Sequence, residues 1–551
     1  MTSPLRIANA SGFYGDRFSA MREMLDGGPI DVLTGDYLAE LTMLILGRDR
    51  LKDPAAGYAK TFLRQLEECL GLAVENGVRI VTNAGGLNPA GLAARIRELA
   101  VRLKIPAKVA HVEGDDLREL HDALTANAYL GAWGIAACLD AGADVVVTGR
   151  VTDASLVIGP AAAHFGWARD DWDALAGATV AGHLIECGAQ VTGGNFAFFT
   201  EIPDLRHPGF PIAEVHSDGS AVITKHPGTG GAVTTETVTA QLLYEIGGPL
   251  YPGPDVSTRL DTVHIEQLAK DRIRVSGATG QPPPPQLKVA LNVLGGFRNA
   301  TTFVLTGLDI EAKAALIRDQ FRPDVDELTW TLARTDHEDA GTEETASALL
   351  HVTARDKDPQ RAGRAFSQAA VELALSSYPG FHASAPPSDA SPYGVYRAAF
   401  VPQDTVPHRA VLPDGSTVDI GPPPAFSETA PQPVESPREA TQHKTRREPL
   451  GRILGARSGD KGGDANLGVW ARTGEAHDWL TGYLTVDRLR ELLPEVGNAI
   501  RYEFPQLRAL NFVVEGILGE GVAENTRFDP QAKALGEWLR ARHADIPEAL
   551  L

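Results

Sequence analysis

Short apolar runs alternate with longer amphipathic segments along the first 200 residues. Runs rich in Val, Ile and Leu predict strands at 5–8, 30–33, 78–81, 108–112 and 144–147. Between them, apolar residues recur at helical spacing, as in the set Tyr58, Phe62, Leu66, Leu70 and Ala73 and the set Leu92, Ile96, Leu99 and Leu103. This order predicts an α/β domain over residues 1–200, built on a doubly wound, mostly parallel sheet.

The pattern changes after residue 200. Extended segments and two helical patterns, near 311–321 and 360–375, predict an α+β region over 201–395 in the same large unit. Within it, the segment 295–299 predicts a hairpin turn between two strands. Residues 396–447 are rich in Pro, Ser, Glu and Thr, which predicts a linker. Strand and helix patterns return at 448–551 and predict a small, separate α+β domain.

Four of the predicted strands end in polar, glycine-containing turns, at 9–16, 34–36, 82–86 and 148–153. In an open parallel sheet the carboxyl ends of neighbouring strands border one crevice, so we expect these turns to line one ligand site. They contain carboxylates, amides and bare backbone N–H groups, which suit an oxygen-rich anionic substrate. The candidate residues are Ser11, Gly12, Gly15, Asp16, Asp36, Asn83, Gly85, Gly86, Arg150 and Asp153.

Each candidate also has a purely structural interpretation. An Asp after a strand caps the next helix as readily as it binds a ligand. Arg150 either binds an anion through its planar guanidinium or pairs with Asp153. Asn83 with Gly85 and Gly86 forms either an oxyanion site or a tight turn that packs a helix on the sheet. Gly12 and Gly15 lack the third glycine of a dinucleotide-binding turn, so the pattern does not favour NAD.

Two later glycine-rich segments add candidates. Gly230 and Gly231 precede a helical pattern, and such a loop is a potential anion site, although it lacks the lysine of a phosphate-binding loop. The segment 455–468 lies between two predicted strands and is dense in glycine and charge. More polar groups occur there than a hairpin needs, so we expect Asp460 and Lys461 to act on substrate and Asp464 and Asn466 to bind it.

Composition narrows the functional classes. The formal charge of −20 and pI near 5.2 disfavour nucleic acid or an anionic membrane as partner. Three widely separated cysteines, Cys69, Cys138 and Cys187, form no disulfide or zinc pattern and favour a cytoplasmic location. No basic region followed by an apolar stretch marks the N-terminus, and no run reaches the ~18 apolar residues of a membrane span. We expect a homo-oligomer that binds a small anionic molecule.

Several of these segments together resemble the acyclic terpene utilisation A family. The resemblance rests on the N-terminal turns, on Gly228-Thr-Gly-Gly231 with Gln241-Leu-Leu-Tyr-Glu245, on Tyr251-Pro-Gly-Pro-Asp-Val256 and on Ser458-Gly-Asp-Lys-Gly-Gly-Asp-Ala-Asn466. It implies a large domain up to about residue 440 and a ferredoxin-like domain over 448–551. It also implies a role in the breakdown of acyclic terpenoids through coenzyme A thioesters, without assigning catalytic residues.

The sequence therefore predicts an enzyme acting on a branched acyl-CoA or related carboxylate, as a hydratase or lyase. Asp36, Asp153 and Asp460 are the candidate acid–base groups, Arg150 and Lys461 bind the anion, and Asn83 holds a thioester oxygen. One alternative is a non-catalytic subunit or binding module of a degradative complex. Another is an enzyme with Mg²⁺ on Asp36 and Asp153 that acts on a phosphorylated or carboxylate substrate. No cofactor is firmly implied; coenzyme A would enter as part of the substrate.

Overall fold

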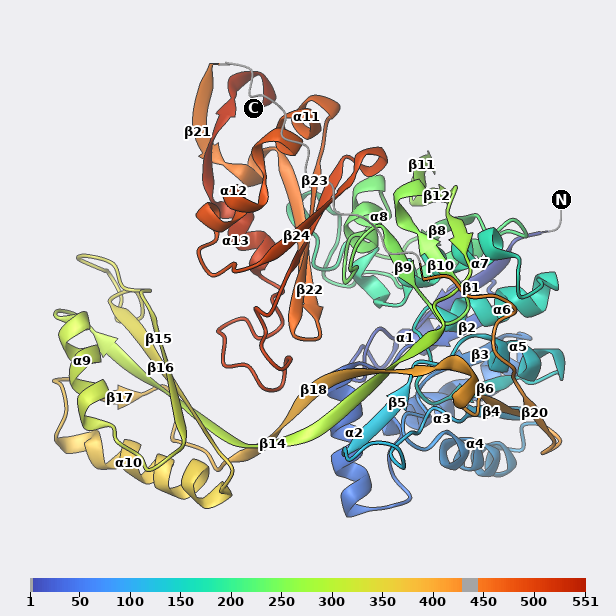
Figure 1. Cartoon of the computed structure of the whole chain (residues 1–551), viewed down its shortest axis with the longest axis horizontal. Coiled ribbons are helices and arrows are strands. Elements are labelled where there is room, and N and C mark those ends of the chain that lie inside the picture. Colours follow the sequence, from blue (N-terminus) through green and yellow to red (C-terminus); the bar gives the residue numbers. More distant parts are fainter. Residues whose placement is uncertain (1–2, 429–443) are drawn as a thin grey trace. The chain divides into compact units, whose positions relative to one another are not determined.

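The computed structural model of the chain describes residues 3–428 and 444–551, which form two compact units (Figure 1). The larger one, here the main unit, comprises residues up to Asn292 together with Arg397–Val522 and Gln531–Leu551. The smaller one, here the inserted unit, comprises Val293–Tyr396 and Ala523–Pro530. No helix in the described ranges is long and apolar enough to cross a membrane.

A sheet of eleven described strands forms the centre of the main unit. Its five middle strands are parallel and run in the order β1 (Leu5–Asn9), β2 (Val32–Gly35), β3 (Arg79–Thr82), β6 (Val145–Thr148) and β4 (Val109–Glu113). Antiparallel strands extend it beyond β1, in the order β7 (Pro211–Val215), β8 (Ala221–Lys225), β12 (Arg272–Ser276) and β11 (His264–Ala269). The sheet as a whole is therefore mixed, with a parallel centre.

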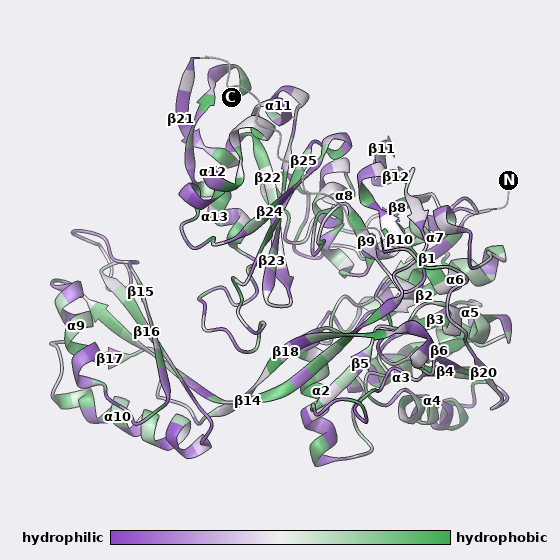
Figure 2. Cartoon of the chain, viewed as in Figure 1, coloured by the Kyte–Doolittle hydropathy of each residue, from purple (hydrophilic) through white to green (hydrophobic). Residues whose placement is uncertain are grey.

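Successive side chains of the parallel strands point to opposite faces of the sheet, and each face carries a hydrophobic core. Ile7 and Val81 face one core, and their chain neighbours Ala8 and Ile80 face the other. The first core includes residues of α5 (Trp133–Asp140), α6 (Ser155–Phe165) and α7 (Trp172–Ile185). The second includes residues of α1 (Ala20–Asp26), α3 (Lys60–Glu75) and α4 (Pro89–Leu103). Helices thus cover both faces, and Figure 2 shows hydrophobic and hydrophilic residues alternating along helices such as α4.

Local signals for helix ends are confirmed. In α3, Phe62, Leu66 and Leu70 are buried, and Gly77 follows its end in the left-handed region at φ 67°. Asn88 caps α4 by accepting a 2.9 Å hydrogen bond from the amide of Gly91. Pro89 occupies the first turn of that helix, where its missing N–H costs nothing.

The predicted α+β region over 201–395 is divided between the two units. Its first part supplies the antiparallel strands next to β1 and a small sheet of β9 (Leu250–Pro252), β10 (Ser257–Arg259) and β13 (Thr279–Gln281). Only 293–396 enters the inserted unit, where β14 (Gln286–Thr306), β15 (Glu327–Ala333) and β16 (Ser347–Asp356) join α9 (Ile310–Gln320) and α10 (Phe366–Glu372). The predicted hairpin at 295–299 is wrong, because these residues lie inside the single long strand β14.

The predicted linker over 396–447 contains structure in its described part. β18 (Ser391–Pro402) extends into it, β19 (Arg409–Val411) pairs with β4, and β20 (Thr417–Asp419) pairs with β19. The strands β19 and β20 have three residues each, which is too short to show a hydrophobic period in the sequence. The Pro-rich residues beside them resemble a linker. The stretch 429–443 of the predicted linker lies outside the described residues.

The C-terminal segment forms a four-stranded antiparallel sheet in the order β22 (Leu454–Lys461), β23 (Asp464–Ala471), β25 (Ala509–Val514) and β24 (Ala499–Phe504). Three helices accompany it: α11 (Gly474–Tyr483), α12 (Val486–Leu492) and α13 (Leu535–Ala541). β22 and β23 are joined only by Gly462 and Gly463, so the charged glycine-rich motif is itself a β-hairpin. Its tip carries Asp460 and Lys461.

Candidate functional site

Asp36 and Asn83 come directly after β2 and β3, which are parallel neighbours. Asn83 donates a hydrogen bond of 2.6 Å from Nδ2 to Oδ1 of Asp36, and accepts one of 2.8 Å from the amide of Tyr37. Asp36 is only 4% exposed. Burial, and then the nearby charge of Asp153, raise the pKa of Asp36 well above its ordinary value. Asn83 therefore orients a carboxyl group whose pKa is raised.

Arg150 follows β6 and lies beside Asp36 and Asp153. Its Nη1 is 2.5 Å from Oδ1 of Asp153, and its guanidinium lies 4.2 Å from the ring centre of Tyr129. The ion pair that the structural interpretation expected is thus present. The positive charge of Arg150 also acts on Asp36, where it lowers the pKa against the effect of burial. The structure brings Asp36, Asn83, Arg150 and Asp153 together at one end of the parallel strands.

Glu40, the first residue of α2 (Glu40–Lys52), adds a carboxylate that the sequence reasoning missed. It accepts a 3.0 Å hydrogen bond from the hydroxyl of Tyr129, and Nζ of Lys288 lies 3.8 Å away. Burial raises its pKa, but Lys288 and Arg150 outweigh burial, so the pKa of Glu40 is lowered. From sequence, Glu40 has the appearance of an ordinary first-turn acid, and its partners are about 90 and 250 positions away.

Glu186, at the end of α7, is a second missed carboxylate. Its Oε1 lies 3.0 Å from Nδ1 of His183, and both residues are buried. Asn9 donates to the carbonyl oxygens of Ile185 and Glu186 at 2.6 and 3.0 Å, which anchors this segment to the turn after β1. Burial, and then the charge of Asp153, raise the pKa of Glu186 well above its ordinary value. Burial lowers the pKa of His183 to about 4, so its imidazole is neutral at pH 7.

Two buried atoms of this pair have no hydrogen-bond partner among the described residues: Oε2 of Glu186 and Nε2 of His183. Buried polar atoms are normally paired, so each such atom in a folded protein calls for an explanation. The sequence signal was weak, because His183 and Glu186 end a strongly apolar helix and read as core residues.

The hairpin formed by β22 and β23 contacts the large domain at Glu245. The amide of Glu245 donates a 2.8 Å hydrogen bond to Oδ1 of Asn466, and its carbonyl oxygen accepts one of 2.8 Å from Nζ of Lys461. Glu245 adopts φ 57°, a left-handed conformation that costs a non-glycine residue about 1 kcal/mol or more. Both of its backbone polar groups are therefore held by the hairpin.

Asp460, at the hairpin tip, interacts electrostatically with Glu40 and with Glu245. Burial, and then the charge of Glu40, raise the pKa of Asp460 to about 6. Burial, and then the charge of Asp460, raise the pKa of Glu245 to about 7. Lys461 keeps an exposed side chain, yet surrounding protein and then the charge of Lys288 lower its pKa.

These residues define what we call the charge cluster. It contains six carboxyl groups and three cations, which come from the strand ends, α2, α7, the Glu245 segment, β14 and the hairpin. Because negative groups outnumber positive ones in a desolvated place, some carboxyls retain protons at neutral pH. The members are Asp36, Glu40, Asp153, Glu186, Glu245, Asp460, Arg150, Lys288 and Lys461.

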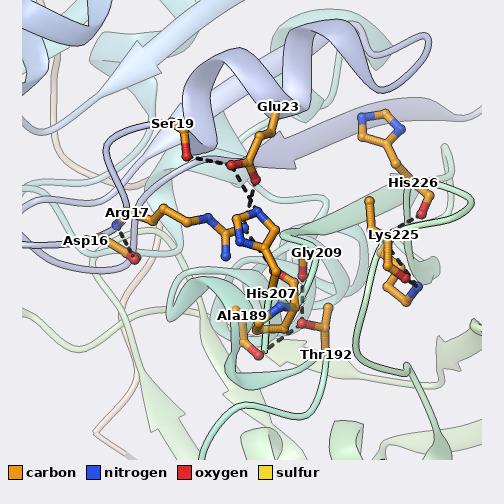
Figure 3. Close-up of polar contacts among 12 residues, drawn as sticks. Asp16, Arg17, Ser19, Glu23, Ala189, Thr192, His207, Gly209, Lys225 and His226 are labelled. Atoms are coloured by element: carbon orange, nitrogen blue, oxygen red, sulfur yellow. Dashed lines mark hydrogen bonds and ion pairs between the residues drawn. The ribbon is translucent and has the colours of Figure 1, made fainter. Parts of the chain in front are cut away.

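Other predicted residues of the first turn shape the backbone. Asp16 accepts hydrogen bonds from the amides of Gly12 and Arg17, at 2.8 and 2.7 Å. Figure 3 shows Asp16 beside Arg17, with Glu23 and His207 nearby. A Cβ on Gly12 would lie 2.7 Å from the carbonyl carbon of Cys187, so glycine permits the close approach to the Glu186 segment. Gly15 packs against Phe13, and the hydroxyl of Ser11 donates to the carbonyl oxygen of Phe13 at 3.0 Å.

The remaining predicted residues also make contacts within the fold. Any side chain at position 86 would be strained, because Gly86 has a φ of 52°. Gly85 packs against Thr148 and Pro89. The amide of Gly231 donates to the carbonyl oxygen of Pro203 at 3.1 Å, and the carbonyl oxygen of Gly230 accepts from Gly209. Figure 3 shows Gly209 and Thr192 in that same neighbourhood. Oδ1 of Asp464 accepts from the amide of Gly516 at 2.8 Å.

The arrangement does not fit a magnesium ion on Asp36 and Asp153. Asp153 is paired with Arg150, and Oδ1 of Asp36 already accepts from Asn83 and from the amide of Leu38. Among the residues that the structure describes, no three Asp, Glu, His or Cys side chains are grouped so as to hold a metal ion. The chemistry available here is that of carboxyl, ammonium and guanidinium groups.

Comparison with known families agrees with this architecture. Residues 5–412 match the acyclic terpene utilisation family protein AtuA, and residues 448–545 match the AtuA ferredoxin-like domain. Since the first match alone covers well over half of the chain, the protein belongs to the AtuA family. Its C-terminal sheet and helices are the ferredoxin-like domain of that family. Neither a curated protein nor a solved structure matches the chain.

Gly85→Ala should destabilise the protein by about 1–3 kcal/mol, because the added Cβ would meet backbone that cannot move easily. It would lie 2.4 Å from the carbonyl oxygen of Thr148 and 2.8 Å from Cα of Pro89. Gly497→Ala is the matched control, since nothing lies within 4 Å of its added Cβ. Denaturant unfolding measures both. Equal stability of the two variants would contradict the packing role of Gly85.

Glu245→Gln should change how stability depends on pH. The folded state raises the pKa of Glu245 to about 7, so the wild-type protein loses stability as pH rises from about 5 to 8. Glutamine cannot ionise, so the variant should gain on the order of 1–3 kcal/mol relative to wild type over that range. Melting temperatures at several pH values measure this difference. The exposed Glu98→Gln serves as control, and a parallel pH profile for Glu245→Gln would refute the assignment.

Proposed function

We propose that the protein is an enzyme of acyclic terpenoid catabolism that acts on a branched acyl-CoA or related carboxylate by carboxylate acid–base chemistry. The AtuA family is linked to acyclic terpene utilisation, which supports the catabolic role. The observation that carries the chemistry is the Glu245–Asp460 pair, whose pKa values of about 7 and 6 suit proton transfer near neutral pH.

Hydration of a carbon–carbon double bond conjugated to a thioester, or its reversal, requires three functions. One carboxylate removes a proton from water while the water oxygen bonds to the β-carbon. A protonated carboxyl then delivers a proton to the α-carbon, and a cation or N–H donor stabilises the enolate oxygen between the two steps. The same groups in reverse remove water.

The charge cluster contains a candidate for each function. Asp36 and Glu186 are buried and their pKa values are raised well above the ordinary range, which favours the protonated form that a general acid needs. Asp460 or Glu245, with pKa values close to neutrality, suits the base. Arg150 and Lys461 are the cations that would bind the thioester oxygen or a substrate carboxylate. Asp153 pairs with Arg150 and would orient it, and Asn83 orients Asp36.

The hairpin makes the C-terminal domain part of this proposal. Asp460 and Lys461 belong to that domain, whereas Asp36, Arg150 and Glu186 belong to the large domain. Contact between the two reduces the exposure of the cluster to water, which strengthens its electrostatic interactions. Coenzyme A would enter only as part of the substrate, and no step here requires a metal ion.

A thermal-shift screen of CoA thioesters that differ in branching and unsaturation, followed by mass spectrometry of the mixtures, tests this proposal. We expect at least one branched thioester to raise the melting temperature and to change mass by one water. Glu186→Gln and Asp36→Asn should each lower turnover by about 10²–10⁴-fold, because general acid catalysis contributes that much.

Asp356→Asn is the matched control. Asp356 is also buried and accepts hydrogen bonds from backbone amides, but it belongs to the inserted unit, so its variant should keep full turnover. Binding of thioesters without any turnover by the wild-type protein would favour the alternative of a non-catalytic binding subunit. Unchanged turnover in both cluster variants would refute the acid–base assignment.

A further inference from the structure

A separate cavity of about 340 Å³ lies in the main unit, and none of the charge cluster residues lines it. Its walls come from the segment before α5, from the turn between α6 and α7, from Pro254 and Asp255, and from residues 403–423 around β19 and β20. The helix α5 packs against β19, so two of these walls are in contact with each other. The volume is at the small end of the range for small-molecule sites.

Arg169 supplies the cavity with a positive charge. Its Nη1 donates to the carbonyl oxygens of Gly421 and Pro422, at 2.6 and 3.2 Å, and its guanidinium lies 5.1 Å from the ring centre of Trp133. Among the described residues, no carboxylate lies within ion-pair distance of Arg169. The other arginine of the wall, Arg409, contrasts with it, since Asp419 and Glu113 lie 3.1 and 3.6 Å from it.

Arg169 is thus anchored through Nη1 while much of its donor capacity stays available. Guanidinium has five N–H donors, and the two carbonyl contacts engage only Nη1. Burial lowers its pKa, and the opposite charge of Asp255 offsets this effect only in part. A planar guanidinium with unused N–H donors is suited to bidentate contact with a carboxylate.

Apart from the arginines and the acids Asp255, Asp404 and Asp419, the wall is apolar or neutral. Leu130, Leu287, Val406 and Ile420 line it together with several prolines and Trp133. Burial lowers the pKa of His408 to about 3, so this imidazole is uncharged. Asp255 is the one buried acid of the wall; its Oδ2 accepts a 2.8 Å hydrogen bond from the amide of Ala132, and burial raises its pKa to about 6.

We propose that this cavity is a second binding site, for a small monocarboxylate with an apolar body. The carboxylate pairs with the guanidinium of Arg169, and the hydrocarbon part packs on Trp133, Leu287 and Ile420. Asp255 opposes the bound anion and limits its affinity. This inference is independent of the proposed function, because none of these residues belongs to the charge cluster.

Isothermal titration of the full chain with octanoate tests the site, with 1-octanol as a probe of the same apolar body without charge. Octanoate should bind the wild-type protein more tightly than octanol. Arg169→Gln should weaken octanoate binding about tenfold to a hundredfold, the loss expected for charged hydrogen bonds. Asp255→Asn should tighten it severalfold, since asparagine can still accept from Ala132 but carries no charge.

Two arginine variants serve as controls. Arg206→Gln removes an exposed charge outside the cavity and should bind octanoate normally, whereas Arg150→Lys alters the charge cluster and reveals any octanoate that binds there instead. Circular dichroism and melting temperature establish that each variant is folded. Loss of octanoate binding in Arg150→Lys rather than in Arg169→Gln would place the probe in the charge cluster and overturn the proposal. Absent binding, or equal binding of octanol and octanoate, would also overturn it.

Discussion

The backbone of Glu245 is the point on which the charge cluster depends. Its left-handed conformation is unfavourable for glutamate, and the hairpin of the C-terminal domain binds both its N–H and its carbonyl oxygen. Asn466, which makes one of these contacts, is fully buried and also donates to Asn511. These hydrogen bonds place the hairpin tip, and with it Asp460 and Lys461, beside carboxylates of the large domain. Strain retained at such a position is typical of functional sites.

Further contacts fix the same domain arrangement. Arg457 donates to the carbonyl oxygen of Asn195 at 2.8 Å and lies over the ring of Tyr244, whose hydroxyl accepts from Lys533 at 2.6 Å. Trp470 of β23 stacks on Phe196 of the large domain. A Cβ on Gly459 would lie 2.4 Å from the ring of Tyr244, so this glycine allows the hairpin to approach. The contact is therefore a packed interface within the main unit.

Crowding of acids is the second constraint. Six carboxyl groups with three cations cannot all ionise at low cost, and burial raises the pKa values of Asp36 and Glu186 well above the ordinary range. Asp460 and Glu245 are partly exposed, and their pKa values lie nearer neutrality. One site thereby contains both proton donors and proton acceptors, which is the basis of the proposed acid–base chemistry.

By itself the sequence determined the parallel strands, the helix ends at Gly77 and Asn88 and the turns that carry Asp36, Asn83 and Arg150, because these features depend on local periodicity and turn chemistry. It also marked the glycine-rich hairpin as unusual. Only the tertiary structure decided that β14 runs unbroken through Gly295, that residues 409–411 pair with β4, and that 293–396 form their own unit. It alone revealed Glu40, Glu186 and Glu245, since their partners are distant in sequence and their pKa values follow from burial and neighbouring charge, which no local pattern encodes.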